Sequence, residues 1–141
     1  MSEAEPCSYC DEGALLDAFG IKIMDLPASK LVLFKEQSHP GRVVVASKYH
    51  VSELVDLTPE QREAFIADVV RVAEAVHKLF NPDKVNYGAY GDTGCHLHFH
   101  LVPKYRDGFE WGGTFAMNPD RTHLTDAEYD ELIAKYREAL A

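Results

Sequence analysis

His96-Leu97-His98-Phe99-His100-Leu101-Val102 is an apolar segment that carries a histidine at every second position. In a β-strand, successive side chains point to opposite faces, so the three imidazoles share one face and the apolar side chains share the other. We expect the apolar face to be buried. A row of imidazoles on such a strand indicates that the imidazoles have chemistry to perform, and an incidental or pH-sensitive histidine cluster is the alternative.

The composition is typical of one globular domain, which we expect over residues 1–141. The chain is 46% hydrophobic and 26% charged, which suits a single core. Its formal net charge is −9 and its Lys and Arg residues do not cluster, which argues against polymeric nucleic acid as a partner. The acidic start of the chain has no apolar core, and no apolar run approaches the ~20 residues of a membrane span, so we expect a cytoplasmic protein without a membrane partner.

The periodicity of the remaining sequence predicts an α+β domain with an antiparallel sheet of about five strands. Strands are expected at residues 21–26, 30–35, 42–46, 85–90 and 97–103. A long helix should begin at Thr58-Pro59-Glu60-Gln61, where a Thr N-cap, a Pro and a Gln form a helix-start signal, and should end at Asn81. A C-terminal helix is expected over residues 125–140, a short helix over 14–18, and a turn over 91–94.

The histidine run resembles the signature of the histidine-triad (HIT) superfamily of nucleotide hydrolases and transferases. The segment Arg42-Val43-Val44-Val45-Ala46-Ser47-Lys48-Tyr49-His50 looks like a second landmark of that family, and the order of elements fits over residues 5–115. The resemblance implies a HIT-like fold and a homodimer. It also implies that His98 attacks the α-phosphorus of a nucleotide, forming a nucleotidyl-histidine, and that His100 orients or protonates groups around the phosphate.

Two cysteines near the start of the chain have the spacing of a zinc knuckle. Cys7 and Cys10 can supply two thiolates from one turn, and a tetrahedral structural site needs two further ligands. In zinc-containing HIT relatives, including the galactose-1-phosphate uridylyltransferase branch, the others are two histidines that correspond here to His50 and His96. The resemblance therefore implies a structural zinc that fastens the segment 5–20 to the sheet. A metal-free dithiol is the alternative.

Four further residues are candidates for nucleotide binding. Glu36 resembles the acid that accepts hydrogen bonds from ribose hydroxyls in the family, and a carboxylate suits a cis-diol because it only accepts. Asn86 and Thr93 approximately match an Asn and a hydroxyl that lie near the phosphate in relatives. Arg42 can clamp a phosphate with two hydrogen bonds. Solvated or turn residues are the plainer interpretation of Glu36, Asn86 and Thr93.

Two departures from the family pattern leave the substrate open. Small HIT hydrolases usually have Pro-Gly-His where this chain has Pro40-Gly41-Arg42, and the uridylyltransferase branch tends to have Arg there. Asp92 replaces a common Gln and brings a negative charge near the phosphate. The leading hypothesis is a phosphoramidase, dinucleoside polyphosphate hydrolase or nucleotidyltransferase. The alternatives are a nucleotide sensor without turnover and a zinc-stabilised interaction protein.

Overall fold

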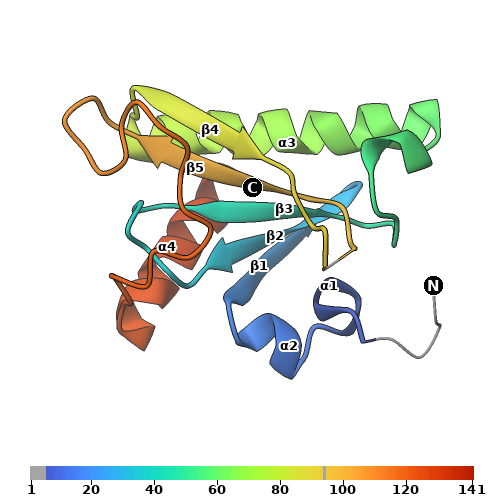
Figure 1. Cartoon of the computed structure of the whole chain (residues 1–141), viewed down its shortest axis with the longest axis horizontal. Helices are drawn as coiled ribbons and strands as arrows, with labels where there is room; N and C mark the ends of the chain where they lie inside the picture. Colours follow the sequence, from blue (N-terminus) through green and yellow to red (C-terminus); the bar gives the residue numbers. More distant parts are fainter. Residues whose placement is uncertain (1–5, 94) are drawn as a thin grey trace.

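A five-stranded antiparallel sheet in the order β1-β2-β3-β5-β4 forms the centre of the computed structural model, which describes residues 6–93 and 95–141 (Figure 1). The strands are β1 (Gly20–Leu26), β2 (Ser29–Phe34), β3 (Val43–Ser47), β4 (Lys84–Gly88) and β5 (His98–Lys104). The predicted α+β class and the antiparallel sheet of five strands are confirmed.

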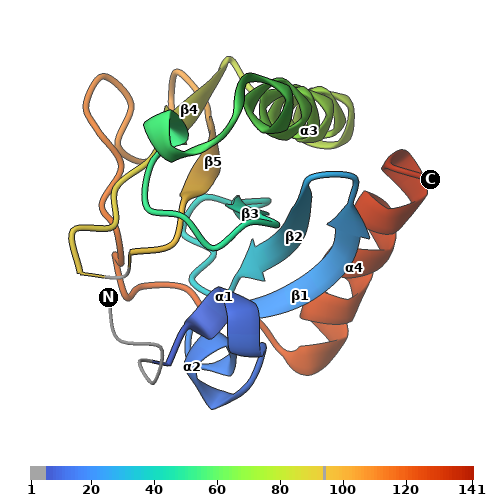
Figure 2. The same cartoon turned by 90° about the vertical axis from the view of Figure 1, so that its right-hand side faces the viewer.

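Two helices, α3 (Pro59–Phe80) and α4 (Asp126–Ala139), cover one face of this sheet (Figure 2). The expected capping box begins α3: the Thr58 hydroxyl accepts from the Gln61 N–H, and the Gln61 side chain accepts from the Thr58 N–H. The long helix is capped at its C-terminal end by Asn81, as expected, and the φ of this residue is 47°, in the left-handed region. Shorter elements are α1 (Ser8–Asp11), α2 (Ala14–Asp17) and the 3-10 helix η1 (Leu54–Asp56).

Each face of the sheet carries its own apolar cluster, because the strand residues alternate between the faces. The main cluster lies between the sheet and α3 and α4, and its members include Leu31, Leu33, Val43, Val45, Leu97, Leu101, Phe65, Val69, Val72, Val76, Ile133 and Tyr136. The second cluster lies on the opposite face and consists of Val32, Phe34, Val44, Ala46, Tyr9 and Leu16. The apolar side of the histidine run is buried as expected, with Phe99 partly buried against the main cluster.

The histidine run lies at the centre of the sheet, because β5 pairs with β3 on one side and β4 on the other. His98 is opposite Ala46 and His100 is opposite Val44 on β3. β5 begins at His98, one residue later than predicted, so His96 lies before the strand. β4 ends at Gly88, two residues earlier than predicted. The predicted N-terminal segment begins, and the predicted turn 91–94 ends, at residues outside the described ranges.

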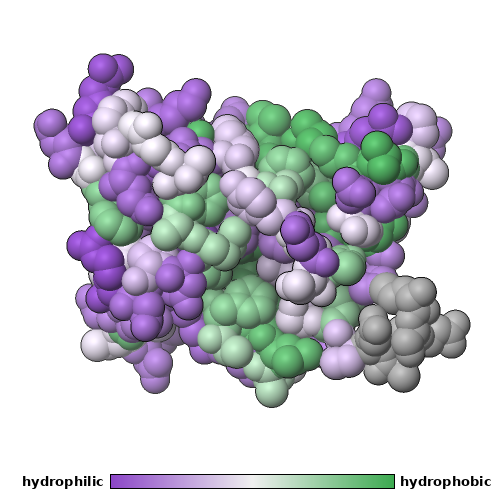
Figure 3. Space-filling view, viewed as in Figure 1, coloured by the Kyte–Doolittle hydropathy of each residue, from purple (hydrophilic) through white to green (hydrophobic). Residues whose placement is uncertain are grey.

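The surface on the side away from α4 is mixed in hydropathy. Hydrophobic side chains gather over the N-terminal end of α3 and over α2 (Figure 3). Leu15 of α2 is 49% exposed and Val55 of η1 is 81% exposed. None of the helices in the described part of the chain has the length and apolar character needed to cross a membrane.

Candidate active site and metal centre

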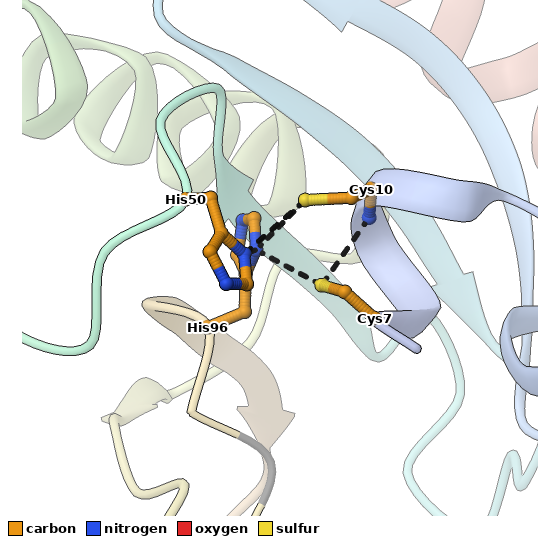
Figure 4. A group of neighbouring side chains, drawn as sticks. All are labelled: Cys7, Cys10, His50 and His96. Atoms are coloured by element: carbon orange, nitrogen blue, oxygen red, sulfur yellow. Dashed lines mark hydrogen bonds between the residues drawn. The ribbon is translucent and has the colours of Figure 1, made fainter. Parts of the chain in front are cut away.

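The four predicted metal ligands converge from separate parts of the chain (Figure 4). The Nδ1 atom of His96 lies 3.3 Å from Cys7 Sγ and 3.2 Å from His50 Nδ1, and Cys10 Sγ lies 3.3 Å from His50 Nδ1. A tetrahedral zinc site with the usual bond lengths has S···N and N···N edges of about 3.6 and 3.3 Å. The donor set therefore fits a Cys2His2 zinc site.

Backbone hydrogen bonds orient two of these ligands, His96 and Cys7. The Nε2 atom of His96 donates to the Ser47 carbonyl at 2.7 Å, so the lone pair of the neutral ring is on Nδ1, which faces the other ligands. Cys7 is the N-cap of α1, and its Sγ accepts from the Cys10 N–H at 3.4 Å. The Cys-x2-Cys spacing thus reflects one helical turn, an element that the sequence interpretation did not anticipate.

His98, the predicted nucleophile, is fixed by the same kind of contact. Its Nδ1 donates to the His96 carbonyl at 2.7 Å, because a carbonyl only accepts, and the lone pair of the neutral ring is therefore on Nε2. Burial lowers the pKa of His98, which keeps the ring neutral at neutral pH. A neutral imidazole with its other nitrogen bound to a fixed acceptor is equipped for nucleophilic attack.

His100 follows on the same face of β5, with its ring centroid 5.2 Å from that of His98. Its Nδ1 lies 3.2 Å from Nη2 of Arg42, which donates to it. Burial and the positive charge of Arg42 lower the pKa of His100 to about 3. The ring is therefore neutral at neutral pH and carries its proton on Nε2.

Arg42 differs from the expected phosphate clamp, because its side chain is completely buried. Its guanidinium donates to the carbonyls of Ala116 and Met117 as well as to His100, and its central carbon lies 4.0 Å from the centroid of the Phe34 ring. Burial lowers the pKa of Arg42 to about 10, so the group stays charged at neutral pH. The guanidinium therefore lies behind His100 and does not line the cavity.

A cavity of about 890 Å³ opens in front of His98 and His100, and this volume suits a drug-sized or nucleotide-sized ligand. Its apolar and aromatic walls are formed by Tyr9, Leu15, Phe19, Phe34, Tyr90 and Met117. Polar lining is supplied by Ser8, Asp92, Thr93 and Asn118. The metal ligands Cys7, His50 and His96 form one side of the same cavity, so the metal centre and the histidine pair share it.

The remaining predicted binding residues divide between the cavity and the protein interior. Thr93 lines the cavity, as does Asp92. Asn86 lies on β4 opposite Val102, away from the cavity lining. Glu36 is also away from the lining. Burial alone would raise the pKa of its carboxyl group. Hydrogen bonds from the backbone of Thr122, Arg121 and Ser38 and from the Ser38 hydroxyl outweigh this effect and lower the pKa to about 2. The Glu36 oxygens hold the chain before α4, and the ribose contact stays a prediction.

Tyr9 is the main site residue that the sequence interpretation missed. Its ring is buried and lies 5.3 Å from the His96 ring and 5.1 Å from the His98 ring, centroid to centroid. It thus connects the metal centre to the predicted nucleophile. The available signal was an aromatic residue inside the Cys-x2-Cys motif. Met117 and Asn118 were also missed, and their position beyond the aromatic stretch 109–115 was the only indication.

The fold and the convergent histidines are those of a histidine-triad protein. Comparison with known proteins agrees, because the HIT domain model matches residues 20–107. The chain therefore belongs to the HIT family. It is 22% identical to a histidine triad protein from Bradyrhizobium japonicum, covering 92% of this chain and 96% of that one at a TM-score of 0.83. A zinc-bound histidine triad family protein from Mycobacterium smegmatis is 26% identical, with coverage of 95% and 92% and a TM-score of 0.65.

Distant relatives of the chain include enzymes that act on dinucleoside polyphosphates. The asymmetrical bis(5'-nucleosyl)-tetraphosphatase of Schizosaccharomyces pombe is 31% identical over 75 residues, which cover 50% of this chain and 41% of that enzyme. The match therefore spans less than half of the relative's length.

Proposed function

We propose that this protein is a nucleotide hydrolase or nucleotidyltransferase that acts at the α-phosphate through a nucleotidyl-histidine on His98. The observation that carries the proposal is the hydrogen bond from His98 Nδ1 to the His96 carbonyl at 2.7 Å. This bond leaves Nε2 as the only lone pair of a ring that lines the cavity. Membership of the HIT family and the dinucleoside polyphosphate enzymes among its relatives support the same reaction class.

The reaction divides one difficult displacement into two. Nε2 of His98 attacks the α-phosphorus, a P–N bond forms, and the bond to the leaving group breaks with its electron pair. The His96 carbonyl accepts from Nδ1–H throughout and stabilises the positive charge that the phosphorylated ring acquires. Water or another acceptor then attacks the same phosphorus and releases His98 as a neutral ring.

The apolar walls of the cavity suit a nucleobase, since aromatic side chains stack on its faces. Tyr9, Phe19, Phe34 and Tyr90 supply such surfaces. Thr93 lines the same cavity, which supports a role for its hydroxyl as a donor to a phosphate oxygen. We infer a mononucleotide unit as the bound group, with Thr93 at its phosphate.

The Cys2His2 cluster is the proposed holder of a structural zinc, made of Cys7, Cys10, His50 and His96. When bound, zinc supplies cross-linking of the N-terminal helices to the sheet and performs no chemistry on the substrate, because all four positions are taken by protein ligands. Because the His96 carbonyl orients the His98 ring, a metal that fixes His96 also fixes the position of His98. A cytoplasmic homodimer, as in the family, belongs to the same proposal.

The test is intact-protein mass spectrometry after brief mixing with nucleotides and a denaturing quench. The panel contains a nucleoside phosphoramidate, a dinucleoside tetraphosphate and a nucleotide sugar. Wild type is compared with His98→Ala and with a matched control, His77→Ala, which removes an exposed histidine of α3. We expect a nucleotidyl adduct in wild type and in His77→Ala that is lost in His98→Ala. Nucleotide binding without adduct or turnover overturns the proposal and indicates a nucleotide sensor.

A further inference from the structure

His100 is held in a single tautomer by Arg42. The Arg42 Nη2 atom lies 3.2 Å from Nδ1 of His100, and a guanidinium carries donors only. Nδ1 of His100 is therefore the acceptor, and the one proton of the neutral ring is on Nε2. Because His100 lies beside His98 and lines the cavity, this N–H is a hydrogen-bond donor next to the proposed attacking group.

Arg42 is fixed in this position by its surroundings. Its side chain is completely buried, and it donates to the Ala116 carbonyl at 3.1 Å and to the Met117 carbonyl at 2.9 Å. The Phe34 ring lies against the guanidinium. In the described part of the chain no carboxylate lies within ion-pair distance of Arg42, although Glu36 and Glu110 are near enough to favour its charge. The guanidinium is in direct contact with His100, so its positive charge opposes a second positive charge on that ring.

The consequence is that His100 can donate a hydrogen bond but cannot supply a proton. Release of the Nε2 proton leaves an imidazolate unless Nδ1 gains a proton. Among the described residues the donor at Nδ1 is the Arg42 guanidinium, which does not deprotonate in proteins. Double protonation of the ring is opposed by burial and by Arg42, which lower the pKa of His100 to about 3. His100 is thus a permanent neutral donor and not a general acid.

Leaving groups differ in their need for a proton. When His98 attacks a phosphoric anhydride, the electron pair of the breaking P–O bond goes to a phosphate oxygen, which departs as a stable anion that a hydrogen bond from His100 can stabilise. When His98 attacks a phosphoramidate, the electron pair of the breaking P–N bond goes to nitrogen. That nitrogen departs as an amine only if a general acid protonates it.

We propose that Arg42, a positioning residue that acts through His100, restricts the nucleotidyl donors of this protein to phosphoric anhydrides and excludes phosphoramidates. This inference rests on the proposed function, because it names the substrate class of the same site. It gives a role to the arginine that departs from the family's Pro-Gly-His. A charged donor at this position replaces a histidine that is able to lose or gain a proton.

The first test compares kcat/KM of the wild-type protein for diadenosine tetraphosphate and for adenosine 5'-phosphoramidate. Since general acid catalysis typically contributes about 100-fold or more, we expect the anhydride to be favoured by about that factor. Equal or faster turnover of the phosphoramidate overturns the inference, because another group then supplies the proton. Adduct formation at His98 from either substrate, followed by mass, reports separately on the proposed function, and its absence from both overturns the two proposals together.

Two variants then assign the preference to Arg42. Arg42→Lys keeps a cation and a donor near His100, and Arg42→His introduces the residue found in the small hydrolases of the family. We expect the lysine variant to keep the preference for the anhydride and the histidine variant to lower it at least about tenfold through a gain in phosphoramidate turnover. An unchanged ratio in Arg42→His contradicts the inference, whereas a purely structural role for Arg42 lowers both rates together.

A measurement that needs neither turnover nor a variant examines the tautomer itself. In the ¹⁵N NMR spectrum of the histidine side chains, we expect His100 to show a protonated Nε2 and an unprotonated Nδ1 throughout the neutral pH range. Protonation at Nδ1, or at both nitrogens, overturns the inference.

Discussion

The histidines at the two ends of the run offer different groups: His96 offers a lone pair on Nδ1, and His100 offers an N–H on Nε2. At His96 the Ser47 carbonyl accepts a hydrogen bond from Nε2–H, which leaves the Nδ1 lone pair facing the thiolates. At His100 the Arg42 guanidinium occupies Nδ1 and leaves the proton on Nε2. Both partners come from the ends of one neighbouring strand, since Ser47 is the last residue of β3 and Arg42 directly precedes it. An acceptor at one end and a cation at the other thus give identical residues different chemistry.

The largest effect is expected at the metal end. In Cys10→Ser the cluster loses one thiolate, and the variant should bind less than one zinc per chain. Binding at about 100 times the dissociation constant stabilises a protein by about 2.7 kcal/mol, so a chelator should lower the free energy of unfolding of zinc-loaded wild type by about 3 kcal/mol. Urea unfolding with and without chelator measures this difference.

The matched control for that comparison is Cys95→Ser, which removes an exposed cysteine outside the cluster. It should respond to the chelator as the wild type does. An equal response of Cys10→Ser to the chelator contradicts the assignment of Cys10 as a ligand.

At the arginine end we expect stability to fall with the pH, by an amount per pH unit that is smaller than the chelator effect. The pKa of His100 is lowered to about 3 in the folded state, against about 6.5 in the unfolded chain. Between these values the unfolded state binds the extra proton, so folding stability falls as the pH decreases from 6.5 toward 3, by up to about 1.4 kcal/mol per pH unit. Above pH 6.5 this contribution is fully present.

Urea unfolding at several pH values checks this prediction in wild type and in His100→Gln. The variant should show a shallower loss of stability across the same pH range, because other groups titrate alike in both proteins. Parallel curves for wild type and His100→Gln would contradict the neutral, buried state of His100.

The smallest effect concerns Tyr9, which packs against His96 at the metal end and against His98 in the middle of the run. Tyr9→Leu keeps an apolar side chain but removes the ring contacts with Phe19, His96 and His98, which should cost about 1–2 kcal/mol of stability. The rate of adduct formation at His98 should fall as the ring loses its neighbour. Tyr9→Phe keeps the ring and should retain both properties, and a loss in Tyr9→Phe equal to that in Tyr9→Leu would assign the effect to the hydroxyl.

The sequence sufficed for features that are encoded locally. Strand alternation, the Thr58 capping box and the Cys-x2-Cys spacing each depend on neighbouring residues, and the structure contains the predicted strands, helix start and ligand cluster. The metal cluster was predictable although it joins distant segments, because the family resemblance supplied His50 and His96. These are the cases in which a short pattern or a known ligand set determines the answer.

The positions of Arg42 and Glu36 were not predictable in this way. The Arg42 guanidinium is held by the carbonyls of Ala116 and Met117, which are more than seventy residues away. The Glu36 carboxylate is held by the backbone of Arg121 and Thr122. Each charged side chain satisfies a backbone segment that comes close only in the folded chain, and no local pattern identifies such a segment.

The connection between β3 and β5 also determines when the metal centre can form. The two strands are adjacent in the sheet but are separated along the chain by the 22-residue helix α3 and by β4. His50 follows β3 and His96 precedes β5, so they meet only after this long-range pairing is complete. A metal held by this cluster should therefore bind late in folding, so that it slows unfolding and leaves the folding rate nearly unchanged.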